Sequence, residues 1–106
     1  MTHYRVVLTT TPDIETARTI ARKVVESRLA ACVNVVPKIE SYYIWEGELQ
    51  EDSEALLVMK TAGHLVAELE RFITSIHPYE VPEFIALRVE EGGDKYLEWI
   101  DQVTKG

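Results

Sequence analysis

Two long stretches of strand-forming residues follow one another in the middle of the sequence. The first, Cys32 to Trp45, is dominated by β-branched and aromatic residues, and the second runs from about Leu49 to Thr61. The dipeptide Glu46-Gly47 between them is suited to a turn. Each arm is about twice as long as a typical strand of about 5–6 residues. The pattern therefore predicts a β-hairpin that projects beyond the core of its domain.

The expected tip of this hairpin is apolar. Tyr42, Tyr43, Ile44 and Trp45 lie close to it, and an exposed apolar edge promotes pairing with another chain. A chain of 106 residues is long enough for one domain with one core. We therefore expect a single domain, residues 1–106, that assembles with other copies of itself.

The remaining periodicity predicts strands at about 5–10 and 84–89, and helices at about 12–29, 62–76 and 94–103. Thr11 and Thr61 are the expected N-caps of the first two helices. The element order is β-α-β-β-α-β followed by a helix, which is typical of an α+β, ferredoxin-like fold. We expect an antiparallel sheet with two helices on one face, an additional C-terminal helix and the long central hairpin. Only the last helix remains to cover the other face.

Composition and motifs exclude several classes of function. The net charge of -7 argues against nucleic-acid binding, which requires a basic surface. No apolar run approaches the about 20 residues of a membrane span, and we expect no secretory signal. The single cysteine fits a reducing, cytoplasmic setting. Motifs of nucleophilic hydrolases, zinc proteases, redox dithiols and nucleotide-binding loops are missing, so we expect a binding protein rather than an enzyme.

Cys32 and His77 are the side chains best suited to bind a metal. Thiolate favours copper(I) and similar soft ions, and imidazole is the commonest metal ligand. Each also has an ordinary structural interpretation. Cys32 suits a small buried apolar position, and His77 suits an interaction with the last carbonyls of the second helix. One cysteine cannot form a site alone, but other copies of the chain or a partner histidine could complete one.

Glu80 and Glu83 follow His77 in a loop framed by two prolines, Pro78 and Pro82. Proline fixes the local backbone, which suits both a binding site and a simple turn. We count both glutamates as further candidate metal ligands. A second acidic group surrounds the hairpin turn and is interpreted as solvated charge: Glu46, Glu48, Glu51, Asp52 and Glu54.

A series of motifs resembles the CutA divalent-cation tolerance family over nearly the whole chain. In order, they are Val7-Leu8-Thr9-Thr10-Thr11-Pro12-Asp13, Leu29-Ala30-Ala31-Cys32-Val33-Asn34, Tyr43-x-Trp45-x-Gly47-x-Leu49, Lys60-Thr61, His77-Pro78-Tyr79-Glu80-Val81-Pro82-Glu83 and Tyr96-Leu97-x-Trp99. The resemblance implies a homotrimer of ferredoxin-like subunits, similar in architecture to PII signalling proteins. It also implies a role in copper tolerance and metal binding.

The resemblance implies a ligand pattern that this chain only partly shares. Some members have a cysteine at the position of Thr9 and a histidine at that of Ile76, proposed with the next histidine as copper ligands. Only His77 matches this pattern here. Threonine and isoleucine are poor copper ligands, so the departure weakens the expectation of a strong copper site.

Two hypotheses follow. The first is a cytoplasmic homotrimer associated with divalent metal tolerance that binds copper or another divalent cation weakly, through His77, Cys32, Glu80 and Glu83. The alternative is a PII-like sensor of a small anionic or nucleotide ligand that acts through an unidentified protein partner. For the alternative, four cationic side chains would have to converge on one cleft: Arg5, Lys38, Lys60 and Arg88.

Overall fold

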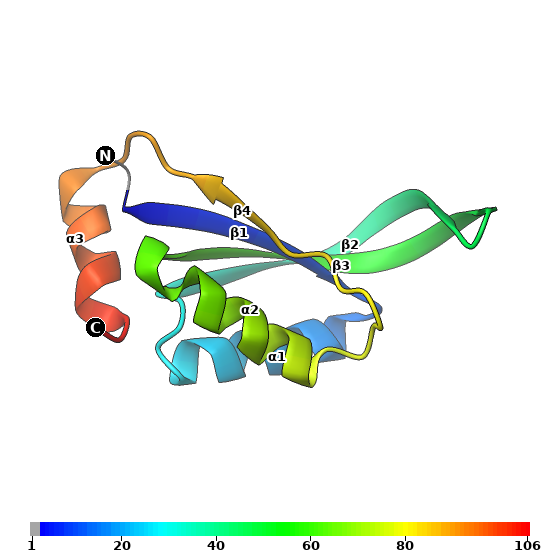
Figure 1. Ribbon diagram of the computed structural model, residues 1–106, viewed down its shortest axis with the longest axis horizontal. Helices are drawn as coiled ribbons and strands as arrows, with labels where there is room; N and C mark the ends of the chain where they lie inside the picture. The colour runs from blue at the N-terminus through cyan, green and yellow to red at the C-terminus, as the bar shows by residue number, and fades with distance from the viewer. Residues whose placement is uncertain (1–2) are drawn as a thin grey trace.

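The computed structural model describes residues 3–106. Its elements, in chain order, are β1 (Tyr4–Thr11), α1 (Ile14–Glu26), β2 (Cys32–Trp45), β3 (Glu48–Ala62), the 3-10 helix η1 (Gly63–Leu65), α2 (Val66–Ile76), β4 (Ile85–Arg88) and α3 (Asp94–Val103). The strands form one antiparallel sheet in the order β2-β3-β1-β4. Helices α1 and α2 cover one face, and α3 lies at the end of the sheet (Figure 1). The predicted α+β, ferredoxin-like arrangement is confirmed.

The core lies between the sheet and the helices α1 and α2. Val7 of β1 pairs with Met59 of β3, and both side chains are fully buried on the helix-covered face. Apolar residues at helical spacing complete this layer from the other side, namely Ala17, Ile20 and Val24 of α1 with Leu69 and Ile73 of α2. Alternate strand residues therefore face the helices, and the residues between them face the other side.

The other face of the sheet, which we call the open face, is largely apolar and incompletely covered. The strand register places on it Val6, Leu8, Val36, Leu56, Val58, Ile85 and Leu87. None of these side chains is fully buried, and Ile85 and Leu87 are each 48 % exposed. Of the helices α1, α2 and α3, only α3 lies on this side, at one end of the sheet (Figure 1).

The β2–β3 hairpin is as long as predicted and projects past the helices (Figure 1). Its arms pair from Cys32 opposite Lys60 to Trp45 opposite Glu48. Glu46 and Gly47 both have positive φ angles, 51° and 80°, as in a type I′ turn. The tip is apolar and exposed, as expected from the sequence.

The register shifts once within the hairpin, between Val36 and Ile39, around Pro37. Proline lacks a backbone donor and is tolerated at a bulge. The extra residue moves the alternation of β2 by one position. Beyond the bulge, Ser41, Tyr43 and Trp45 therefore lie on the same side as the open face.

Both predicted N-caps are wrong. Helix α1 is capped by Asp13, whose Oδ1 accepts a hydrogen bond from the Thr16 backbone N–H at 2.7 Å, while the Thr11 hydroxyl donates to the Asp13 carbonyl. Thr61 belongs to β3, and its hydroxyl donates to the Leu29 carbonyl at 2.6 Å. The 3-10 helix η1 precedes α2, so the helix begins later than expected.

Candidate functional site

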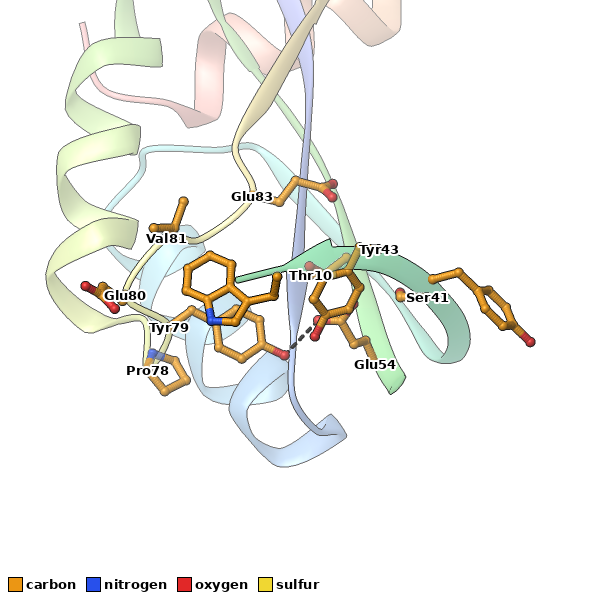
Figure 2. A pocket seen from close by; sticks show the side chains of 11 residues that line it. Thr10, Ser41, Tyr43, Glu54, Pro78, Tyr79, Glu80, Val81 and Glu83 are labelled. Carbon is orange, nitrogen blue, oxygen red and sulfur yellow. Dashed lines mark hydrogen bonds between the residues drawn. The ribbon is translucent and has the colours of Figure 1, made fainter. Parts of the chain in front are cut away.

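A pocket of about 650 Å³ lies between the 77–83 loop and one face of the hairpin (Figure 2). Its walls come from the end of β1, both hairpin arms and the loop: Thr10, Ser41, Tyr42, Tyr43, Trp45, Glu54, Pro78, Tyr79, Glu80, Val81 and Glu83. The pocket borders the open face, because Thr10 and Glu54 lie on that side of β1 and β3. Its lining includes four aromatic rings and three carboxyl groups but no lysine or arginine.

Glu54 and Tyr79 form the central polar contact of the pocket. The Tyr79 hydroxyl donates to Glu54 Oε2 at 2.7 Å, drawn as a dashed line in Figure 2. Glu54 is only 8 % exposed. Burial, followed by this hydrogen bond and the negative charge of Glu54, raises the pKa of Tyr79 far above its ordinary value. Tyr79 therefore keeps the proton with which it donates to Glu54.

His77 is a buried anchor of the loop. Its Nε2 lies 2.7 Å from the Thr10 carbonyl, and its Nδ1 accepts a hydrogen bond from the Tyr79 backbone N–H at 3.0 Å. A carbonyl requires a donor and an N–H an acceptor, so these contacts fit a neutral ring protonated at Nε2. The rings of His77 and Tyr79 are 4.9 Å apart. Both ring nitrogens are thus occupied in fixing the loop to β1 and orienting Tyr79.

Cys32 lies away from this pocket. It is opposite Lys60, which is in turn opposite Val6 of β1, whereas His77 contacts Thr10 of the same strand. Four residues along a strand correspond to about 13 Å. The thiol of Cys32 instead lies near Tyr96 of α3, where burial and then the thiol raise the pKa of the tyrosine. Cys32 and His77 therefore do not form one site within a chain.

Glu80 and Glu83 both line the pocket and are solvent-exposed. Partial burial in the pocket, together with the negative charge of Glu54, raises the pKa of Glu83. Among residues 3–106, no group of three or more His, Cys, Asp or Glu side chains is placed to hold a metal ion. Of the four predicted ligands, His77, Glu80 and Glu83 thus lie in one loop, but the Glu80 and Glu83 side chains point away from each other (Figure 2).

Glu54 is a pocket residue that the sequence interpretation missed. Its acidic neighbours at the turn indicate solvated charge, but the structure buries Glu54. Side chains alternate between the two faces of a strand, so Ser41, Tyr43 and Trp45, spaced by two residues, are expected to share a face. Only the bulge at Pro37 decides that Glu54 shares that face too, because it sets the pairing of Ile39 with Glu54.

The four cationic residues of the alternative hypothesis do not converge. Arg5 is opposite Arg88, and the register places both on the helix-covered face. Lys60 lies on the open face, where its ammonium group donates to the Asn34 side chain. Lys38 lies in the bulge of the hairpin. Within one chain these four side chains therefore do not line one cleft, and the PII-like alternative stays a prediction.

Comparison with known proteins decides the family. Residues 5–103 match the family model described as CutA1 divalent ion tolerance protein. The chain belongs to the CutA1 family. It is 54% identical over 96 residues to "Protein CutA" of Mus musculus, covering 91% of this chain and 54% of the relative. It is 50% identical over 99 residues to "Divalent-cation tolerance protein CutA" of Thermus thermophilus, covering 93% of this chain and 96% of the relative.

Solved structures of CutA1 proteins have the same fold. The Thermus thermophilus structure has a TM-score of 0.94 at 49% identity and covers 96% of this chain and 99% of its own. The Oryza sativa structure has a TM-score of 0.95 at 43% identity and covers 98% of this chain and 95% of its own. The chain spans about half the length of the mammalian relatives it matches.

The family name describes tolerance of divalent ions and no chemical reaction. The names of relatives differ in location: one from Arabidopsis thaliana is called chloroplastic, and a structure from Archaeoglobus fulgidus is called periplasmic. Within residues 3–106, every helix is too short or too polar to cross a membrane. A cytoplasmic location stays a prediction for this chain.

Proposed function

We propose that this chain is a non-enzymatic, cytoplasmic subunit of a homotrimer that takes part in divalent-cation tolerance. The observation that carries the assembly is the open face, which exposes a continuous apolar surface on three strands, including Val58, Ile85 and Leu87. Exposed apolar patches of this kind mark protein–protein contacts. The projecting hairpin supplies further apolar surface at its tip, where Ile44 is 67% exposed.

The cation-binding part of the proposal concerns the pocket mouth. Glu80 and Glu83 are accessible carboxylates, and carboxylate oxygens bind divalent cations. Because the two carboxylates point away from each other (Figure 2), each would hold a cation without a second formed ligand, and we expect weak binding. A copper site with both Cys32 and His77 would need these residues from different copies of the chain. It would also need the Tyr79 N–H to release Nδ1 of His77.

Light scattering tests the assembly. We expect a mass three times that of one chain at low micromolar concentration. Leu87→Asp places a charge on the open face and should lower the mass to that of one chain. Val25→Asp is the matched control, because Val25 is 40% exposed on α1, on the other side of the sheet. A monomer for the unsubstituted protein, or equal dissociation of both variants, would contradict the proposal.

Calorimetry with Cu²⁺ tests the cation part. The double variant Glu80→Gln/Glu83→Gln should weaken binding by several-fold, because it removes both accessible carboxylates of the pocket mouth. Glu90→Gln/Glu91→Gln removes the same charge from exposed positions outside the pocket and serves as the control. Cys32→Ser reports separately on the thiol. Equal binding by both double variants would exclude the pocket carboxylates as ligands.

A further inference from the structure

The charge of Glu54 has no cationic partner in the pocket. Its side chain is more than nine-tenths buried, and its hydrogen bond comes from the neutral hydroxyl of Tyr79. The two ion pairs identified among residues 3–106, Arg18–Glu15 and Lys105–Glu68, both lie elsewhere. A buried carboxylate is costly unless a positive charge compensates it. The lining of the pocket therefore offers the Glu54 carboxylate no positively charged side chain.

The walls around Glu54 suit an organic cation better than a bare metal ion. Tyr43 and Trp45 are two residues apart on one face of β2, and Tyr79 lines the pocket from the loop opposite (Figure 2). Aromatic faces attract ammonium groups, most strongly when these are poorly hydrated. The volume of about 650 Å³ is within the range of small-molecule sites.

We propose that this pocket binds a small organic ammonium ion. Its positive charge would lie against the Glu54 carboxylate, and its apolar substituents would contact Tyr43, Trp45 and Tyr79. The proposal goes beyond divalent-cation tolerance and assembly, since neither requires an organic ligand. Glu80 and Glu83 add negative potential at the entrance, which favours the approach of a cation.

A pair of isosteric probes tests the charge requirement. Choline and 3,3-dimethylbutan-1-ol have the same shape, but only choline is charged. Trp45 fluorescence reports on the pocket in a Trp99→Phe background, which removes the other tryptophan. We expect saturable binding of choline and at least about tenfold weaker binding of the alcohol. Equal binding of the two probes, or no saturation by choline at about 100 mM, would overturn the proposal.

A pair of variants tests the role of Glu54. Glu54→Gln keeps an acceptor for the Tyr79 hydroxyl but removes the charge, so choline binding should weaken at least about tenfold. Glu51→Gln removes the same charge from β3 on the opposite side of the hairpin, outside the pocket, and should leave binding unchanged. Similar affinities in the two variants would overturn the proposal.

The same experiment separates this inference from the proposed function. Choline binding is measured on the assembled protein, whose mass and Cu²⁺ binding are recorded in parallel. Intact mass and Cu²⁺ binding without choline binding would overturn this inference alone. Choline binding seen only after dissociation by Leu87→Asp would also overturn it, because a neighbouring copy would then fill the pocket.

Discussion

His77 and Tyr79 together determine where the 77–83 loop lies. The imidazole ties the loop to the Thr10 carbonyl, and the phenol ties it to Glu54. In the sequence, a histidine in a loop framed by prolines suggests a metal ligand. The contacts of this ring instead describe a structural histidine, because each nitrogen already has a backbone partner. Its participation in metal binding stays a prediction.

Replacement of His77 by phenylalanine should destabilise the fold by about 1–3 kcal/mol. The benzene ring preserves the apolar volume but leaves the Thr10 carbonyl and the Tyr79 N–H without partners in a buried region. Urea unfolding measures the change, and His64→Phe is the control because His64 is exposed. A His77→Phe variant as stable as the parent would show that the two hydrogen bonds contribute little.

Tyr79 should make stability sensitive to alkaline pH. Its pKa is raised in the folded state, so the folded protein keeps a proton that the unfolded chain releases above about pH 10. The contribution of Tyr79 to the free energy of unfolding is therefore fully present below that pH and decreases as the pH rises beyond it. Unfolding free energies measured from pH 8 to 11 should fall less steeply for Tyr79→Phe. Parallel curves for the two proteins would contradict this role of Tyr79.

At the scale of elements, the hairpin depends on a two-residue turn in which Gly47 takes a positive φ that glycine adopts without strain. Gly47 has a φ of 80°, and nothing lies within 4 Å of a Cβ added there. Gly47→Ala should cost about 1 kcal/mol from backbone strain alone. Gly106→Ala is the control, since its surroundings are equally open and its φ is not positive. Equal stability of the two variants in urea unfolding would contradict the strain argument.

The hairpin and the element order were predictable because both depend on local patterns. Long β-branched arms, a glycine turn and helical spacing of apolar residues act within short segments. The pocket was only partly predictable, because it joins segments distant in sequence. The loop at His77 stood out, whereas Glu54 became a pocket residue through the bulge at Pro37 and the packing of Tyr79. The burial of Glu54 depends on tertiary packing, and the acidic residues beside it in the sequence do not indicate it.

At the scale of the whole molecule, the open face should couple folding to assembly. If copies bury this face against one another, unfolding also separates the copies, and mass action makes the melting temperature rise with protein concentration. We expect this rise between about 1 and 100 μM for the parent chain and for Val25→Asp. Leu87→Asp should melt at a lower temperature that does not depend on concentration.

Differential scanning calorimetry at several concentrations measures this coupling. It does not depend on the pocket, because Leu87 lies on β4 and is not among the pocket residues. A melting temperature that does not depend on concentration would contradict this coupling. It would mean that the parent chain folds with its open face exposed to water. In a domain of this size, such a result would require the core beneath α1 and α2 to provide all the stability, with none from contacts between copies.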